Sequence, residues 1–395
     1  MGLGKKTLDD LNVEPGMPVL VRVDFNVPLK DGEVADDARI KAALPAIERL
    51  SGAGAKLILC SHLGRPRGAD PSTSLAPVSK RLGELVDARV YQAPEVIGPE
   101  ARRGAARLEA GEILVLENTR WESGETKNDP KLAEELAELA AAFVLDAFGS
   151  AHRAHASTVG VAEYLPSYAG PLLEKEVTTL QRVVDSPERP LVVVLGGAKV
   201  TDKIALIDRF LEIADAILIG GAMAFSFFRA QGIETGDSLV EEEGVELAAR
   251  ALEKAESSDC DLALPVDLVA GRAFSADTEV RELDETAVPE GWMGLDVGPR
   301  TVERFAAEIS QAGTVFWNGP MGAFELKPFA AGTRGVAEAV AAAPGYTVIG
   351  GGDSGAAIAE FGLADRVDWL STGGGASLEL LEGKELPGLE ALDDA

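Results

Sequence analysis

The sequence predicts an α/β protein of two domains, each built on a parallel sheet that helices cover on both faces. Its 395 residues exceed the usual size of one domain, and 46% of them are apolar, which suffices for two cores. Short strand-like apolar runs alternate with helical patterns along nearly the whole chain. Such alternation is typical of parallel sheets, because parallel neighbours need a crossover connection between them.

The first half of the chain holds three strand–helix pairs and one further strand. Each strand-like run is short, and each helical segment repeats apolar residues at helical spacing. The pairs are 19–25 with 38–50, 55–61 with 75–86, and 112–118 with 129–143, and the further strand is 142–148.

A long helix is predicted between the two halves. Leu172, Leu173, Val177 and Leu180 fall on one helical face, and a polar segment with two prolines follows at 185–190. We therefore expect a first domain over residues 1–170, a connector helix at 171–184 and a second domain that begins at residue 185.

Glycine-rich turns dominate the second half. Strand-like runs continue there, and three glycine turns each stand where a strand would lead into a helix. These segments are 191–203, 346–358 and 369–381. Glycine lets the backbone approach a ligand closely, and a helix N-terminus presents free N–H groups with a partial positive charge. Three such turns predict a surface that holds several phosphates.

The formal net charge of −28 argues against a nucleic-acid partner and against an anionic membrane surface. No apolar run reaches the roughly 18 residues of a membrane span. The first residues lack the apolar stretch of a signal peptide, so we expect a cytoplasmic protein.

Basic residues follow four strands of the first half. They occur with nearby polar residues as Arg22, Asp24, Asn26 and Arg39, as His62 and Arg65, as Arg120, and as His152, Arg153 and His155. Any one of them could be a surface or ion-pair residue, and Asp24 and Asp146 could simply orient arginines. Because four strand ends share the pattern, it predicts a pocket for a small, multiply anionic substrate.

Three side chains of the glycine-rich half suggest a nucleotide site. Lys199 and Lys203 are four residues apart, so they are expected to share a face on the first turns of a helix. Asp353 lies inside a glycine loop, where its carboxylate suits Mg²⁺ between protein and phosphates. Glu325 could bind a ribose diol or cap a helix; the pattern leaves both open.

The reaction class follows from what these residues offer. The sequence lacks the common motifs of a nucleophilic hydrolase or a zinc protease. Lysines and glycines for nucleotide phosphates, together with arginines for an anion, indicate phosphoryl transfer. No general base is obvious, which favours a carboxylate acceptor, because a carboxylate is already ionised at neutral pH.

Ten segments in order resemble the phosphoglycerate kinase family over essentially the whole chain. They include VRVDFNVPL from residue 21, SHLGRP from 61, LGGAKVTDKI from 195 and FWNGPMGAFE from 316. The resemblance implies a monomer of two Rossmann-like domains joined by the connector helix across a deep cleft, with the C-terminal tail from residue 377 packed on the first domain. The second domain would then end at residue 376.

The resemblance also implies the reaction and its site residues. The enzyme would transfer a phosphoryl group between 1,3-bisphosphoglycerate and ADP, with Mg²⁺, giving 3-phosphoglycerate and ATP. The residues expected to bind the glycerate are Asp24, Asn26, Arg39, His62, Leu63, Gly64, Arg65, Arg120 and Arg153. Those expected to bind the nucleotide are Lys199, Lys203, Gly220, Gly221, Glu325, Gly351, Gly352, Asp353 and Ser354, with Asp353 as the metal ligand. Arg39, Lys203 and Gly373, Gly374 and Gly375 would act on the phosphoryl group in flight.

Two other functions compete with this interpretation. Gly350, Gly352 and Gly355 match G-x-G-x-x-G, a pattern typical of dinucleotide-binding loops. This pattern favours an NAD-dependent oxidoreductase. Asp353 inside that loop argues against it, because a carboxylate repels a pyrophosphate unless a cation lies between them. A non-catalytic anion-binding protein is the second alternative. Ala222, where the family usually has a third glycine, is a departure near the expected base site.

Overall fold

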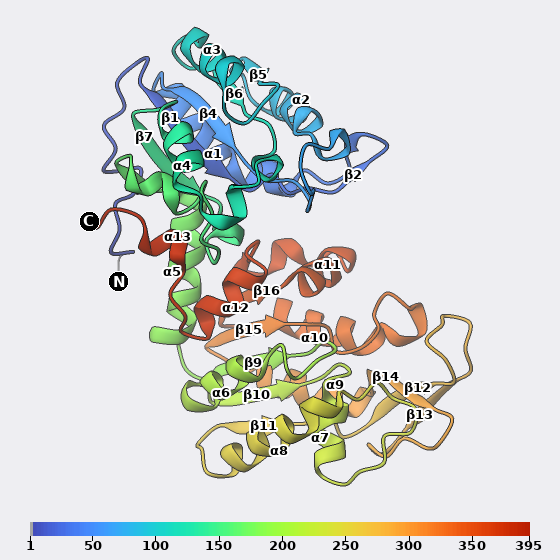
Figure 1. Cartoon of the computed structure of the whole chain (residues 1–395). Coiled ribbons are helices and arrows are strands. Elements are labelled where there is room, and N and C mark those ends of the chain that lie inside the picture. Colours follow the sequence, from blue (N-terminus) through green and yellow to red (C-terminus); the bar gives the residue numbers. More distant parts are fainter. Residues whose placement is uncertain (1–2) are drawn as a thin grey trace. The chain divides into compact units, whose positions relative to one another are not determined.

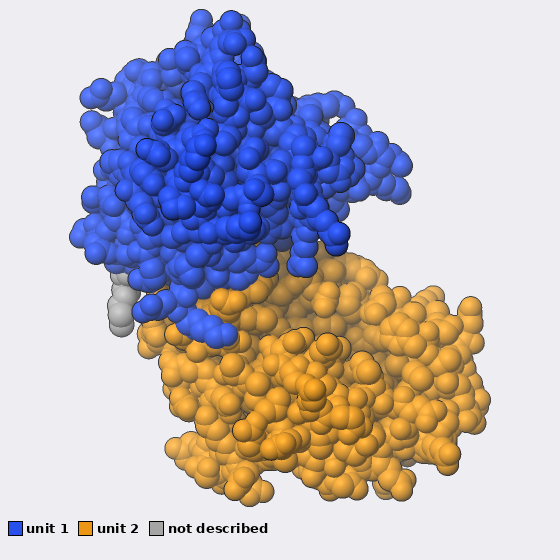
Figure 2. All heavy atoms as spheres, viewed as in Figure 1, with its two compact units in different colours: residues 1–178, 384–395 blue, residues 179–383 orange. Residues whose placement is uncertain are grey.

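The computed structural model describes residues 3–395. It contains two compact units, residues 1–178 with 384–395 (unit 1) and residues 179–383 (unit 2), coloured separately in Figure 2. The predicted connector is helix α5 (Pro171–Asp185), and the boundary between the units falls inside it. We expected the tail to join unit 1 from residue 377, but it does so from residue 384. The reason is that helix α12 (Gly375–Leu381) packs on α6 (Ile204–Ile213) within unit 2.

Unit 1 is built on a six-stranded parallel sheet in the order β5-β6-β4-β1-β7-β8. Its strands are β1 (Pro18–Val23), β4 (Lys56–Cys60), β5 (Val90–Gln92), β6 (Ile113–Val115), β7 (Ala142–Asp146) and β8 (Ser167–Ala169). Its helices are α1 (Ala38–Gly52), α2 (Ala76–Leu85), α3 (Pro99–Arg107), α4 (Pro130–Ala137) and α13 (Pro387–Glu390). Strands β1, β4 and β7 lie next to one another inside this sheet (Figure 1). They are buried almost throughout, which explains why they read as continuous apolar runs.

Unit 2 repeats this scheme with a parallel sheet in the order β11-β10-β9-β15-β16-β17. The strands are β9 (Leu191–Leu195), β10 (Ala216–Ile219), β11 (Asp261–Ala263), β15 (Thr314–Asn318), β16 (Tyr346–Gly350) and β17 (Trp369–Leu370). Besides α6 and α12, its helices are α7 (Ala224–Ala230), α8 (Glu242–Glu256), α9 (Pro299–Ile309), α10 (Ala331–Ala341) and α11 (Gly352–Glu360). The predicted α/β class and the parallel sheets are confirmed.

Two short antiparallel sheets were not predicted. In unit 2, β12 (Leu268–Gly271) pairs with β13 (Val280–Leu283) and β14 (Met293–Val297). In unit 1, β2 (Leu29–Lys30) and β3 (Glu33–Val34) form a hairpin. Its turn residues Asp31 and Gly32 both have positive φ, as a tight two-residue turn requires.

Each of the three glycine turns connects a strand to a helix, as predicted: β9 to α6, β16 to α11 and β17 to α12. Because all strands of one parallel sheet end at the same edge, the turns of unit 2 gather there, and so do the polar loops of unit 1. The fold therefore forms one potential binding edge in each unit.

Candidate functional site

Four loops at the carboxyl edge of the sheet carry the predicted anion-binding residues of unit 1. Asp24 and Asn26 follow β1, residues 62–65 follow β4, Arg120 follows β6 in a short 3₁₀ turn, and Arg153 follows β7. Arg65, Arg120 and Arg153 line one cavity of about 540 Å³. The structure thus brings three of the predicted arginines to one cavity, whereas Asp24, Asn26 and His62 are not part of its lining.

Hydrogen bonds join the first of these loops to its neighbours. The Arg39 guanidinium, on α1, donates to the Asp24 carboxylate at 2.9 Å, so Asp24 does orient an arginine. The Gly64 N–H donates to the Asn26 side-chain oxygen at 2.9 Å, and Arg120 donates to the Gly64 carbonyl at 2.6 Å. These contacts hold the loops after β1, β4 and β6 in one arrangement.

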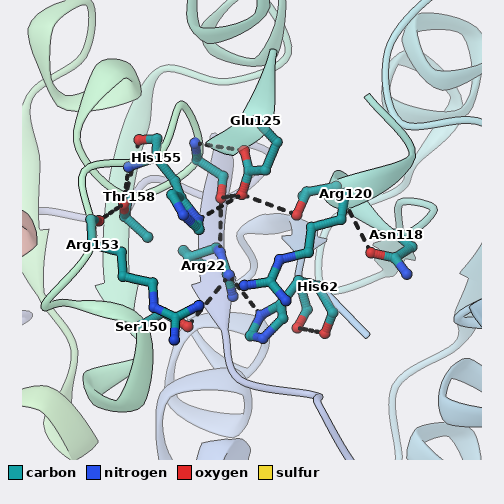
Figure 3. Close-up of polar contacts among 12 residues, drawn as sticks. Arg22, His62, Asn118, Arg120, Glu125, Ser150, Arg153, His155 and Thr158 are labelled. Atoms are coloured by element: carbon teal, nitrogen blue, oxygen red, sulfur yellow. Dashed lines mark hydrogen bonds and ion pairs between the residues drawn. The ribbon is translucent and has the colours of Figure 1, made fainter. Parts of the chain in front are cut away.

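Asn118 fixes the loop that follows β4. Its side chain accepts from the Leu63 N–H at 3.1 Å and donates to the Leu63 carbonyl at 2.7 Å. It also accepts from the Arg120 N–H at 3.1 Å (Figure 3). One buried amide therefore positions residues from two neighbouring strand ends.

The electrostatics of this edge are strongly positive. Burial, followed by the nearby Arg22 and Arg120 charges, holds the pKa of His62 well below its usual range. Burial, then Arg153, lowers the pKa of Arg120. Burial lowers the pKa of His155 to about 4. An anion that neutralised the arginines would relieve their repulsion, so the site favours a multiply charged anion.

Unit 2 has a larger and more apolar cavity of about 750 Å³ at the corresponding edge of its sheet. Phe225, Leu268 and Met321 line it, together with the predicted residues Gly221, Glu325 and Asp353. Ala222, the departure from the family pattern, is also part of the lining. An apolar pocket with few polar groups suits a flat heterocyclic base.

Close backbone packing explains the glycines below this cavity. At Gly221, φ is +68°, and an added Cβ would lie 2.5 Å from the Gly197 nitrogen. At Gly196, an added Cβ would lie 2.1 Å from the Pro320 carbonyl oxygen. The turns after β9, β10 and β15 are therefore in contact through their main chains, while Gly220 donates its N–H to the Leu195 carbonyl at 2.8 Å.

The two lysines do not share a helical face, so that prediction is wrong. Helix α6 begins at Ile204, with Lys203 at its N-cap and Lys199 exposed in the preceding turn. The Glu241 carboxylate accepts from the Thr201 N–H at 3.0 Å and from its hydroxyl at 2.5 Å. These bonds hold residues 199–203 in a turn instead of a helix.

Lys203 is partly buried and lies against Asn318, at the end of β15. Its ammonium donates to the Asn318 carbonyl at 3.0 Å and also to the Asn318 side-chain oxygen. Burial lowers the pKa of Lys203 to about 8, and Asp353 and Asp202 oppose this shift.

Asp353 lies exposed on the first turn of α11, after Gly351, whose φ is +94°. Ser354 beside it is buried, and its hydroxyl accepts from the Gly319 N–H at 2.5 Å. Gly374, with φ of +53°, forms the N-cap of α12 between Gly373 and Gly375. These two turns present main-chain N–H groups at helix starts, as an anion site needs.

Sequence reasoning grouped Arg22 with the residues at the strand ends but missed its buried partners Ser157 and Glu125. Arg22 is inside β1 and fully buried, and it contacts Ser157, which in turn contacts Glu125. An arginine within an otherwise apolar strand was the signal that could have revealed them. Asp146, considered as an arginine partner, instead accepts from the N–H groups of Leu172 and Leu173 at the start of α5.

Across residues 3–395, the helices are too short or too polar to cross a bilayer. The sequence model of one family, described as phosphoglycerate kinase, matches residues 8–384. A phosphoglycerate kinase of Thermosipho africanus is 53% identical over 393 residues, which is 98% of both chains. One from Clostridium novyi is 52% identical over 398 residues, and the match covers all of both chains.

Solved structures agree with these matches. The phosphoglycerate kinase of Coxiella burnetii superposes with a TM-score of 0.89 at 40% identity and covers 98% of each chain. That of Pyrococcus horikoshii superposes with a TM-score of 0.87 at 35% identity, again over 98% of each.

Proposed function

The chain belongs to the phosphoglycerate kinase family, and on that premise we propose that it transfers a phosphoryl group reversibly between 1,3-bisphosphoglycerate and ADP. The single observation that best supports this proposal is that one chain has both an arginine-rich edge in unit 1 and a glycine-rich, partly apolar edge in unit 2. One edge suits a small polyanion and the other suits a nucleotide. The reaction belongs to glycolysis, and we propose that the enzyme works as a cytoplasmic monomer.

Unit 1 would bind the glycerate. Its carboxylate and phosphate would be held by the residues that the sequence predicted, namely Asp24, Asn26, Arg39, His62, Leu63, Gly64, Arg65, Arg120 and Arg153. Asn26, Gly64 and Arg120 support this role because their mutual hydrogen bonds preorganise the three loops. Arg39 would also reach the phosphoryl group, with Asp24 holding its guanidinium in place.

Unit 2 would bind the nucleotide. The base would enter the apolar cavity beside Gly220 and Gly221, and Glu325 on its lining would bind the ribose. Lys199, Lys203, Gly351, Gly352 and Ser354 would contact the phosphate chain, and Gly373 to Gly375 would face the transferred group. The alternative role of Glu325 as a helix cap has less support, since that side chain is exposed and lines the cavity.

Magnesium fits this arrangement as a companion of the nucleotide. In the described part of the chain, no three His, Cys, Asp or Glu side chains gather around a possible metal position. Mg²⁺ usually needs only one or two carboxylates when phosphate oxygens complete its shell. Asp353, exposed at the start of α11, would supply that carboxylate. The bound ion would neutralise charge on the phosphates.

The chemistry would be direct in-line transfer without a covalent enzyme intermediate. A carboxylate acceptor needs no general base, so the protein supplies position and positive charge. Arg39 and Lys203 would stabilise the charge of the phosphoryl group in flight, and closure of the two units on their substrates would exclude water. Small-angle scattering should show compaction only when both substrates are bound.

A coupled assay tests the function directly. ADP release should require both ATP and 3-phosphoglycerate, whereas ADP release without the glycerate would contradict the proposal. Asp353→Ala should abolish the Mg²⁺-dependent part of nucleotide affinity and leave 3-phosphoglycerate affinity unchanged, with each ligand measured separately by calorimetry. Equal losses for both ligands would contradict the metal role.

A further inference from the structure

Arg22 is a fully buried cation at the end of β1, directly behind the anion site. Its Nε–H donates to the Ser157 hydroxyl at 2.9 Å, and one terminal nitrogen donates to the Val23 carbonyl. The other terminal nitrogen lies 3.0 Å from Nδ1 of His62 (Figure 3). Arg22 thus connects the core of unit 1 to a predicted substrate residue.

This contact determines the proton position on His62. A guanidinium has only hydrogen-bond donors and stays protonated in proteins, so Nδ1 of His62 must accept. The ring proton then resides on Nε2, and the imidazole is neutral. The charged and titratable groups that face the ring are Arg22 from β1, Arg120 after β6, Arg39 from α1 and His155 after β7. These groups disfavour an imidazolium, as does the burial of the ring.

The Glu125 carboxylate balances the positive charge of Arg22 through Ser157, which lies between them. It is fully buried in a 3₁₀ turn and accepts from the Ser157 hydroxyl at 2.6 Å and from the Ser157 N–H at 3.1 Å. The Thr119 hydroxyl lies 3.1 Å from the same carboxylate. Because the single hydroxyl hydrogen of Ser157 points to Glu125, its lone pairs face the Arg22 Nε–H.

We propose that Glu125, Ser157 and Arg22 form a positioning relay that fixes His62 as a neutral donor through Nε2. The relay has one direction: Arg22 donates to Ser157, which donates to Glu125, while a second Arg22 N–H fixes the imidazole. His62 then offers a substrate anion a hydrogen bond that does not change between about pH 5 and about pH 8. The purpose of the relay rests on the proposed role of His62 in glycerate binding.

Nitrogen NMR of the full-length protein with ¹⁵N-labelled histidine tests the tautomer without any substrate. The chain has three histidines, and the His62 signals are those lost in His62→Gln. We expect an unprotonated Nδ1 and a protonated Nε2 that stay unchanged between about pH 5 and about pH 8. A proton on Nδ1, or a titration of His62 within this range, would overturn the proposal.

Glu125→Gln and Ser157→Ala test the relay itself. Both should weaken 3-phosphoglycerate binding roughly 10-fold and let the His62 nitrogens exchange tautomers or titrate, because Arg22 loses its anchor. Glu112→Gln is the matched control: this buried carboxyl precedes β6 and bonds to the Tyr91 hydroxyl and the Glu109 N–H, apart from the relay.

Several results would separate the possible failures. If Glu125→Gln and Ser157→Ala match the control in affinity and in His62 spectra, the relay is refuted. If His62→Gln binds 3-phosphoglycerate as tightly as the parent, the donor role is refuted, although the tautomer itself would still be established by NMR. In that case the proposed kinase function would be judged by the coupled assay alone.

Discussion

The two units share one architecture, but the binding edges that they present differ in kind. Unit 1 and unit 2 each have a six-stranded parallel sheet with loops gathered at its carboxyl edge. In unit 1 those loops deliver charged side chains, and Arg22, Glu125 and Asn118 are buried behind them. In unit 2 the loops deliver glycines whose main chains touch, with Lys203 and Asp353 as the main charges.

This difference shows what each kind of site requires. A side-chain site needs buried partners, because an arginine or histidine must be oriented before it can discriminate between anions. A main-chain site needs space instead, because N–H groups are presented only where no Cβ keeps the loops apart. Substitutions should therefore weaken ligand binding in unit 1 by removing charge, and in unit 2 by adding side-chain atoms that overlap with a neighbouring loop.

The largest effect is expected for Arg39→Ala in unit 1. Removing a charge that acts mainly in the transition state should lower kcat by roughly 10²–10⁴-fold. Steady-state kinetics with both substrates would measure it. Arg49→Ala, at the other end of α1, is the control because Arg49 bonds to Leu8 and Asp9. A loss confined to KM would show that Arg39 only binds the ground state.

Gly221→Ala should cause the largest steric effect in unit 2. The new Cβ would meet Gly197 and Pro320 at 2.5–2.8 Å in a left-handed conformation. We expect about 2–4 kcal/mol less stability against unfolding, together with weaker ADP binding. Gly355→Ala in α11 is the matched control, because its Cβ would meet Leu370 at an ordinary 3.4 Å. Equal ADP affinities for the two variants would contradict the main-chain explanation.

Lys203 should make nucleotide binding depend on pH. Its pKa of about 8 means that the ammonium is charged below that pH and is lost as the pH rises through it. ADP affinity should therefore fall about three- to tenfold between about pH 7 and about pH 9. Calorimetry across this range should show no such fall in Lys203→Gln, whereas Lys199→Gln should keep it. A pH-independent parent would refute this role.

The last expected effect concerns the pH dependence of stability and rests on one buried carboxyl in each unit. Burial raises the pKa of Asp146 to about 7 and that of Asp296 to about 8. Both folded-state pKa values exceed the model value of 3.8 that applies to the unfolded chain. Each protonated carboxyl therefore contributes its full stability below pH 3.8, and this contribution is lost as the pH rises through the folded-state pKa of about 7 or about 8. Each group changes stability by at most about 1.4 kcal/mol per pH unit.

Denaturant unfolding at several pH values would measure this loss. Asp146→Asn and Asp296→Asn should each remove part of the pH dependence between about pH 5 and about pH 8. If the stability difference between the parent and each variant does not fall as the pH rises over this range, the sign is contradicted. The two carboxyls are comparable because each accepts main-chain N–H groups at the start of a helix, from Leu172 in unit 1 and from Gly332 in unit 2.

Local patterns predicted the elements, and they placed the candidate site residues after strands, where the structure also has them. Apolar runs located the strands, and the glycine turns stand between strand and helix as expected. Long-range contacts were not readable in this way. Thr201 is held in a turn by Glu241, 40 residues away, and Arg22 binds Ser157 across 135 residues. No rule of sequence spacing predicts such contacts. The prediction that Lys199 and Lys203 share a helical face was therefore wrong, and the contacts among Glu125, Ser157 and Arg22 were not predicted.

The C-terminal segment of unit 1 has a consequence for how the protein folds during synthesis. Lys6 donates its N–H to the Asp393 carbonyl at 2.8 Å, and Gly388 donates to Ala151 at 2.8 Å. Unit 2, in contrast, is one continuous stretch, residues 179–383. We therefore expect the half that leaves the ribosome first to be completed last, once the final residues emerge, while unit 2 has every part it needs before translation ends.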